Sequence, residues 1–135
     1  MLYREEEREM NPLCADQGVG LIPWSPLARG VLARAGSEEA TTRAGSDERI
    51  GTLYTDADND RQILDRVAQV ARERQVPPAQ VALSWVLRQP GVSAPIVGAT
   101  KERHVDDAVA AVDLALTDKE LAFLAEPYRP RAVAH

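Results

Sequence analysis

The chain has 135 residues, which is about the length of one ordinary domain. Hydrophobic residues make up 44% of it and charged residues 27%, close to the average for soluble globular proteins, so disorder of the whole chain is excluded. Acidic residues outnumber basic ones by 21 to 16, and the net charge of −5 argues against nucleic acid as a partner.

A helix is predicted near the start of the chain. The charged run at residues 4–9 is typical of a solvated helix face, and the apolar residues that follow at helical spacing predict a short buried stripe. This stripe consists of Met10, Leu13 and Cys14. Pro12 lies inside the pattern, so the helix either kinks there or begins there with Asn11 as its cap. Gly18 is well placed to end the helix, because glycine adopts a left-handed conformation at little cost.

A strand and a long irregular segment come next. Residues 19–24 are short, apolar and bounded by turn residues, which predicts a buried strand. Pro23 cannot donate to a ladder, so the strand ends close to it, and residues 25–30 form a stiff turn. Residues 34–59 show no apolar period, which is typical of either a functional lid or a disordered segment.

Two consecutive helices are predicted in the middle of the chain. Asp58, Asn59 and Asp60 offer caps for the first, which ends before Val76. Its apolar face consists of Ile63, Leu64, Val67, Val70 and Ala71. The second begins at Pro78 and its apolar side consists of Val81, Ala82, Trp85 and Val86. On this side, Trp85 is expected to be a core residue and not a ligand contact.

The last part of the chain predicts a strand at residues 92–98, a helix capped by Thr100 and a final short helix. The apolar face of the first helix consists of Val105, Ala108, Val109 and Val112. Thr117 and Glu120 form a capping box that opens the second. The alternation of helices and strands predicts an α/β chain with a parallel sheet. Because two strands do not make a stable sheet and a full barrel needs roughly 250 residues, we predict a single incomplete domain over residues 1–135.

Several kinds of site are absent from the sequence. There is no glycine-rich dinucleotide motif after a strand, no phosphate-binding P-loop, no HExxH zinc motif and no nucleophile elbow. Cys14 is the only cysteine, which excludes an intrachain disulfide and a cysteine-built metal site. No apolar run approaches the roughly 20 residues that cross a bilayer, and no secretory signal opens the chain, so we predict no membrane partner and a cytoplasmic location.

The turn at Gly98–Thr100 is a candidate anion site. It joins the end of a predicted strand to the start of a helix, where free backbone N–H groups and the helix dipole favour phosphate. Lys101 and Arg103 lie in the first turn of this helix, where their charge opposes the dipole unless a bound anion compensates them. The alternative is a plain capped helix with solvated basic side chains.

Two segments together carry a family resemblance. Residues 22–30 (IPWSPLARG) and 95–101 (PIVGATK) resemble the C-terminal half of an aldo-keto reductase, in the bacterial branch related to the potassium-channel beta subunits. Residues 2–10, 78–85 and 117–120 fit the same family in the same order. The resemblance implies a partial TIM (β/α)₈ barrel, its C-terminal half with two or three parallel strands, that binds NADP(H) without a Rossmann fold.

The resemblance also implies a set of cofactor contacts. The turn after the seventh strand would wrap the pyrophosphate, which carries over to Trp24, Ser25, Pro26, Leu27 and Gly30. The turn after the eighth strand would hold the adenosine 2′-phosphate, which carries over to Gly98, Thr100 and Lys101. His104 and Asp107 match positions that contact the adenine ribose or base. Residues 34–59 would form a cofactor belt, in which Arg43 matches a phosphate contact.

The chain departs from the family at several points. Ala108 stands where the family often has an asparagine that contacts adenine, and residues 33–35 replace the usual Gly-Lys of the belt. The family's catalytic Asp, Tyr, Lys and His lie before the residue that matches Met1, and Tyr3, Tyr54 and Tyr128 do not match the proton donor. No catalytic residue is therefore assigned here.

The function that the resemblance implies is the cofactor-binding half of an NADP(H)-dependent aldo/keto reductase-like oxidoreductase. A small aldehyde or ketone would be its substrate only if the N-terminal half were supplied. The alternative is a catalytically inactive, truncated remnant that binds a nucleotide or a partner. Because missing strands leave a sheet edge and apolar faces uncovered, self-association or a complementary chain is expected.

Overall fold

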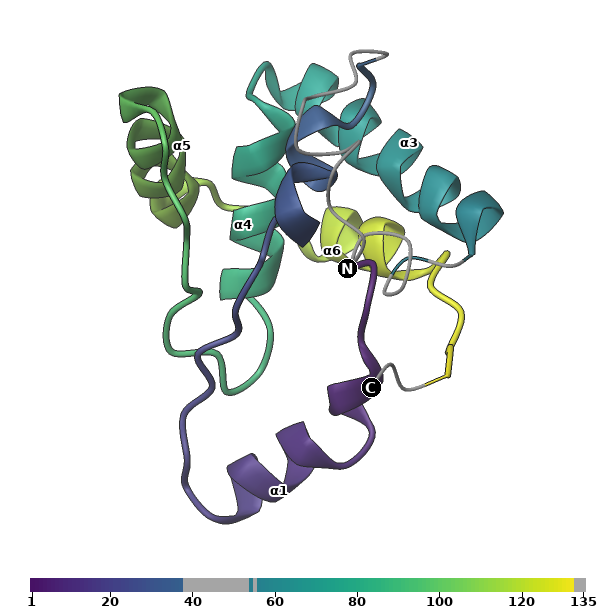
Figure 1. The fold of residues 1–135 in the computed structure, drawn as a ribbon, viewed down its shortest axis with the longest axis vertical. Helices are drawn as coiled ribbons and strands as arrows, with labels where there is room; N and C mark the ends of the chain where they lie inside the picture. Colours follow the sequence, from purple (N-terminus) through teal and green to yellow (C-terminus); the bar gives the residue numbers. More distant parts are fainter. Residues whose placement is uncertain (38–53, 55, 133–135) are drawn as a thin grey trace.

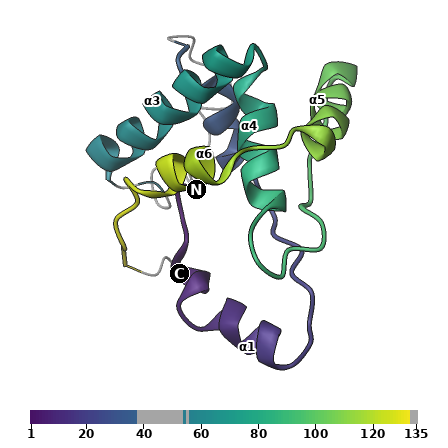
Figure 2. The ribbon, with the colours of Figure 1, turned by 180° about the vertical axis from the view of Figure 1, so that it is seen from behind.

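The computed structural model describes residues 1–37, 54 and 56–132. Three helices form most of a closely packed region: α3 (Ala57–Arg74), α4 (Pro78–Leu87) and α6 (Asp118–Ala125). Two short 3-10 turns, η2 (Ala28–Gly30) and η3 (Leu32–Arg34), pack beside α4. A third turn, η1 (Glu5–Glu7), leads to α1 (Met10–Asp16), which stands apart from this region, while α5 (Glu102–Asp113) flanks α4 (Figures 1 and 2).

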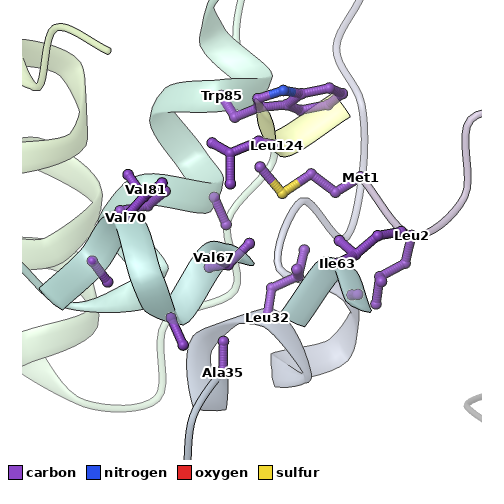
Figure 3. Close-up of a cluster of buried hydrophobic side chains, with 14 of the residues drawn as sticks. Met1, Leu2, Leu32, Ala35, Ile63, Val67, Val70, Val81, Trp85 and Leu124 are labelled. Carbon is purple, nitrogen blue, oxygen red and sulfur yellow. The ribbon is translucent and has the colours of Figure 1, made fainter. Parts of the chain in front are cut away.

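The core lies where α3, α4, α6 and η3 meet the first two residues of the chain (Figure 3). We call this region the helical body; it comprises residues 1–2, 28–35, 57–87 and 114–125. Its fully buried apolar side chains include Leu2, Leu32, Ile63, Val67, Val70, Val81 and Leu124. The apolar faces predicted for α3 and α4 are therefore confirmed, and Trp85 is a core residue as predicted.

The helix ends of the body follow the predicted local signals closely. Asp56 caps α3 by accepting the amide of Asn59 at 3.0 Å, two residues earlier than the first predicted cap. Gln75, in the left-handed conformation, ends this helix, and Pro78 opens α4 as predicted. The predicted capping box of α6 is present, because Thr117 accepts the amide of Glu120, whose carboxylate in turn accepts the Thr117 amide at 2.7 Å.

A buried polar cluster fastens both ends of the described chain to α3. The Glu5 carboxylate accepts hydrogen bonds from the Tyr128 hydroxyl and from the Arg131 amide. Arg131 in turn pairs with Asp60 at 2.8 Å, and Asn59 donates to the carbonyl of Pro127. The sequence pattern assigned residues 4–9 to a solvated face, which is wrong for Glu5, because that side chain is buried among partners distant in sequence.

The two predicted strand segments run side by side but form no regular strand in the described part of the chain. Isolated parallel bridges join Leu21 to Val92 and Trp24 to Ile96. The amide of Ile96 donates to the Pro23 carbonyl at 2.9 Å. Pro23 and Pro95 have no amide hydrogen, so each segment lacks one of the donors that a continuous ladder requires. The parallel direction thus agrees with the prediction, whereas a partial barrel with two or three parallel strands is not confirmed.

Helix α1 begins before Pro12 instead of at it. Glu9 is its cap residue, so Pro12 lies in the first turn, where a missing amide hydrogen removes no helical bond. Gly18 ends the helix as predicted, with a φ of +67°. The amide of Val19 donates to the Cys14 carbonyl at 2.8 Å and that of Gly18 to Ala15, which is a Schellman motif.

The apolar surfaces predicted to be buried outside the helical body are exposed. They come from α1, from the two bridged segments and from α5, and we call them together the open face. The open face consists of Met10, Leu13, Val19, Ile22, Trp24, Ile96, Val105, Val109 and Val112, whose exposed fractions lie between 49% and 69%. The predictions of a buried stripe on α1 and of a buried strand at residues 19–24 are therefore wrong for these side chains in this chain alone.

Candidate functional site

The turn that follows Trp24 has an unusual backbone. Ser25, Ala28 and Arg29 adopt positive φ angles of 51°, 49° and 56°, and Gly30 follows at 89°. Positive φ is uncommon for residues other than glycine, and such strain is concentrated at ligand-binding sites and other places where the surrounding structure enforces it. Three such residues within five positions, followed directly by a glycine with positive φ, make this the most strained segment of the described chain.

Hydrogen bonds within the turn hold this conformation. The Ser25 hydroxyl oxygen accepts a hydrogen bond from the amide of Arg29 at 3.1 Å. The backbone carbonyl of Ser25 accepts one from the amide of Ala28 at 2.9 Å. A serine hydroxyl that accepts one bond still has its own hydrogen to donate. The carbonyl of Leu27 accepts the amides of Gly30 and Leu32, at 2.9 and 3.2 Å. The turn is thus a preformed loop with a hydroxyl able to donate to an anion.

The second predicted turn leads into α5. Lys101, and not the predicted Thr100, is the cap residue of this helix, and its side chain makes no capping hydrogen bond. The Thr100 amide points to His104 Nδ1 at 3.4 Å, a long contact. A Cβ built on Gly98 would meet no atom within 4 Å, so there is open space next to this glycine.

The two turns leave the same end of the paired segments. Because the bridge between Trp24 and Ile96 is parallel, the chain continues from both residues in the same direction, to Ser25 on one side and to Val97 on the other. Figure 1 shows both segments rising from the α1 end before they part, one toward η2 and the other toward α5. The carboxyl ends of neighbouring strands are where α/β folds bind ligands.

The remaining predicted contacts have different surroundings. Asp107 accepts a hydrogen bond from the Gln80 side chain at 2.9 Å, so it holds α5 against α4. Trp24, whose backbone is bridged to that of Ile96, has 60% of its surface exposed. Arg43 lies outside the described residues, as does most of the predicted belt at 34–59; of that range, residues 57–59 belong to α3.

The described residues offer little chemistry for a reaction of their own. No group of three or more histidine, cysteine, aspartate or glutamate side chains among them is placed to hold a metal ion. Tyr128 is engaged in the buried polar cluster, where burial and the hydrogen bond to Glu5 raise the pKa of its hydroxyl to about 12. It is therefore a poor proton donor. A surface cavity of about 440 Å³, between η3 and the α3–α4 turn, contains none of the predicted site residues.

The described part of the chain contains no helix with the length and apolarity that a membrane span requires.

Comparisons with known proteins agree with the resemblance drawn from the two turns. Over 98% of its length the chain is 44% identical to the versiconal hemiacetal acetate reductase of Aspergillus parasiticus. It is 45% identical, over 96% of its length, to a putative aryl-alcohol dehydrogenase of Schizosaccharomyces pombe, and 38% identical, over 97%, to one of Saccharomyces cerevisiae. The chain spans only 39%, 36% and 38% of the lengths of these three relatives.

A family-level comparison gives the same result. Residues 1–128 match the profile of the "Aldo/keto reductase family", a range that includes both turns, the open face and the whole helical body. The match therefore does not depend on the two turns alone. The chain belongs to the aldo/keto reductase family.

Proposed function

We propose that this chain supplies the NADP(H)-binding part of an oxidoreductase that interconverts a carbonyl compound and an alcohol. The observation that carries the proposal is the pair of turns at the same end of the two bridged segments, one strained and the other bordered by open space. The family gives the reaction class, since its named relatives are reductases and putative alcohol dehydrogenases.

The residues present fit a dinucleotide phosphate. The turn at Ser25–Gly30 would hold the pyrophosphate, because its serine hydroxyl can donate and its shape is already fixed by internal hydrogen bonds. The turn at Gly98–Lys101 would hold the 2′-phosphate, which carries roughly two negative charges and suits a helix N-terminus with a lysine beside it. The largely exposed Trp24 side chain would contact a nucleotide ring. When bound, the cofactor supplies the hydride.

This chain's own part is to bind and orient the cofactor. Tyr128, in the buried polar cluster, is poorly suited to donate a proton at neutral pH. No group of described side chains is placed to hold a metal ion. We therefore expect the purified 135-residue chain to reduce no carbonyl compound with NADPH. Turnover above that of a heat-inactivated sample would contradict this division of labour.

The test is a pair of binding titrations in a chimera. In it, this chain replaces the matching segment of the versiconal hemiacetal acetate reductase, to which it is 44% identical. Lys101→Glu removes one attraction to the 2′-phosphate and adds one repulsion, a difference of roughly 1.5–3 kcal/mol, or about ten- to a hundredfold in affinity. Binding of NADPH, followed by its fluorescence, should weaken by this factor, and binding of NADH should barely change.

The chain offers a matched control, because Lys119 is its only other lysine. Lys119 is exposed on α6, far in sequence from both turns, and Lys119→Glu changes the net charge by the same amount. It should leave both affinities unchanged. If Lys101→Glu weakens NADPH and NADH equally, the adenosine end of the cofactor is not at Lys101. If the chimera binds neither cofactor, the proposal fails as a whole.

A further inference from the structure

We propose that Arg34 is a further cofactor ligand, and that its guanidinium binds the pyrophosphate at the Ser25–Gly30 turn. This inference rests on the proposed function and deepens it, because it adds a charged residue to a turn that so far contributes a hydroxyl and its backbone. The resemblance assigns Arg34 no role, since residues 33–35 are a point at which the chain departs from the family. The position of its side chain in the structure is what distinguishes this residue.

The Arg34 side chain lies against the strained turn. Arg34 is the last residue of η3, four positions after Gly30. A Cβ built on Gly30 would lie 2.8 Å from Arg34 Nη1 and 3.8 Å from Arg34 Cζ, so the guanidinium is in contact with this glycine. Gly30 also has a φ of +89°, which glycine adopts without strain. A glycine at this position therefore leaves room for a charged group directly beside the turn.

Arg34 differs from the other arginines that the structure describes. Within the described residues, its side chain makes no hydrogen bond and no ion pair, although it is partly buried. The other described arginines whose side chains lack such a partner are all exposed, namely Arg61, Arg72, Arg88, Arg103 and Arg129. Water solvates an exposed guanidinium, whereas a partly buried one without an acceptor costs free energy. An anion is the group that the Arg34 position lacks.

The turn offers further hydrogen-bond donors and no competing acid. The sequence has no aspartate or glutamate from residue 17 to residue 37, although the chain carries 21 acidic residues. The Ser25 hydroxyl oxygen accepts the Arg29 amide and can still donate its own hydrogen. The amide of Leu27 has no acceptor among the residues that the structure describes. A hydroxyl, an amide and a guanidinium on one turn are thus available to the oxygens of a phosphate group.

The place of Arg34 on this turn selects the pyrophosphate as its ligand. A guanidinium is a planar fork of N–H donors, which can bind two phosphate oxygens at once. The 2′-phosphate is assigned to the turn at Gly98–Lys101, which follows the other bridged segment. NADPH and NADH share the pyrophosphate and differ in the 2′-phosphate. Arg34 should therefore contribute equally to the binding of both cofactors, whereas Lys101 should contribute to that of NADPH alone.

The experiment measures the affinity of both cofactors in the chimera with the versiconal reductase. Arg34→Gln removes the charge and should weaken the binding of NADPH and NADH by the same factor, about ten- to a hundredfold. Arg34→Lys keeps the charge without the fork, and should recover part of this loss for both cofactors. Added salt should weaken binding to the parent more than binding to Arg34→Gln, because the variant has one charge fewer for the salt to screen.

The matched control is Arg72→Gln. A Cβ built on Gly36, which also has a positive φ, would lie 3.8 Å from Arg72 Nη1, so this guanidinium too is near such a glycine. Arg72 is exposed on α3 and belongs to neither turn, and its substitution removes the same charge. Both affinities should stay at the values of the parent. Without cofactor, neither Arg34→Gln nor Arg34→Lys should lower the thermal midpoint of the chimera.

The possible results separate this inference from the proposed function. If Arg34→Gln binds both cofactors like the parent while Lys101→Glu still weakens NADPH, Arg34 is no ligand and the proposed function stands. A loss for NADPH alone would place Arg34 at the 2′-phosphate and would equally overturn the proposal. Thermal midpoints that fall together with the affinities, in Arg34→Gln and Arg34→Lys alike, would show that the side chain only supports the turn. If the parent chimera binds neither cofactor, the proposed function fails and this inference fails with it.

Discussion

The helical body and the open face use the same sequence pattern with opposite outcomes. In the body, Val67 lies on the apolar stripe of α3 and has no exposed surface. On the open face, Val109 lies on an equally regular stripe of α5 and has 63% of its surface exposed. The periodicity of a helix therefore indicates that a face requires a neighbour, and it does not indicate that the neighbour is in the same chain. The difference between the two regions is therefore one of coverage by the described chain, not one of sequence pattern.

The largest expected difference in the free energy of unfolding is between alanine substitutions of two leucines, one in each region. Leu124 is buried in the body and Leu13 is 55% exposed on the open face. Leu124→Ala should lower the free energy of unfolding by about 2–5 kcal/mol, because it leaves a cavity. Leu13→Ala should lower it by less than about 0.5 kcal/mol, because an exposed side chain has little packing to lose.

Urea unfolding followed by circular dichroism measures both variants in the isolated chain. Similar losses for the two leucines would show that the open face is already covered, for instance by self-association, and would remove the contrast between the two regions. The same pair in the chimera sharpens the comparison. There, Leu13→Ala should become costly and approach the effect of Leu124→Ala.

A smaller effect is expected at the polar cluster that fastens the C-terminal segment to α3. Asn59 is buried; its amide donates to the Pro127 carbonyl and its oxygen accepts the Arg129 amide at 3.1 Å. Asn59→Ala leaves both backbone groups without this partner, at a cost of about 1–3 kcal/mol. Asp58→Ala, at an exposed neighbouring position, is the matched control and should cost about 0.5 kcal/mol through the helix dipole. Limited proteolysis within residues 129–131 should accelerate only in Asn59→Ala; no change there would mean that other contacts hold the segment.

Local signals predicted the helices in both regions, because capping and helical hydrogen bonds involve residues close in sequence. Gly18 ends α1, Pro78 opens α4 and the Thr117–Glu120 box opens α6, as the sequence indicates. Strands depend on neighbours distant in sequence, and here each segment has one partner and a proline that interrupts pairing. The predicted strands therefore appear as two bridges. The buried polar cluster could not be predicted, since Glu5 and Arg131 are 126 positions apart and follow no spacing rule.

In the candidate site, too, some features follow from local sequence signals and others come only from the structure. The turn at residues 25–30 was predicted from its prolines, serine and glycine, and the structure adds the run of positive φ angles. Thr100 was assigned as a cap from its residue type, but the helix begins one residue later. Asp107 has a ligand role by resemblance, which stays a prediction, and the structure adds its hydrogen bond from Gln80.

In the helical body, we expect the ionisation of one carboxylate to make the free energy of unfolding depend on pH by about 1–2 kcal/mol. Hydrogen bonds from Arg74, followed by those from Thr117, lower the pKa of Glu120 from 4.5 to about 2. The folded pKa lies below the unfolded one, so this stabilisation is complete above pH 5 and is lost as the pH falls from about 4.5 toward 2. Because the Arg74–Glu120 pair is partly exposed to solvent, its contribution to the free energy of unfolding is only about 1–2 kcal/mol.

Glu120→Gln isolates this contribution, because glutamine can keep the capping hydrogen bond while it removes the charge. Between pH 5 and pH 2 the unfolding free energy of this variant should fall less steeply than that of the parent. Glu73→Gln, which removes an exposed carboxylate from the same end of α3, serves as the control and should follow the parent. Parallel curves for the parent and both variants would mean that the Arg74 pair does not favour the ionised form.

The smallest effects on the free energy of unfolding are expected for two glycines of the candidate site. One substitution tests backbone strain, and the other tests whether the open space beside a glycine receives the ligand. Gly30 has a φ of +89°, and a Cβ there would lie 2.8 Å from Arg34 Nη1, so Gly30→Ala should lower the free energy of unfolding by about 1 kcal/mol. Gly98 has no positive φ and open space where a Cβ would lie, so Gly98→Ala should be neutral or stabilise by about 0.5 kcal/mol through the unfolded state. If that open space receives the 2′-phosphate, Gly98→Ala should nevertheless weaken NADPH binding in the chimera while it leaves NADH binding nearly unchanged. A Gly98→Ala variant that binds both cofactors like the parent would show that the space beside this glycine is not part of the site, whatever Lys101 contributes.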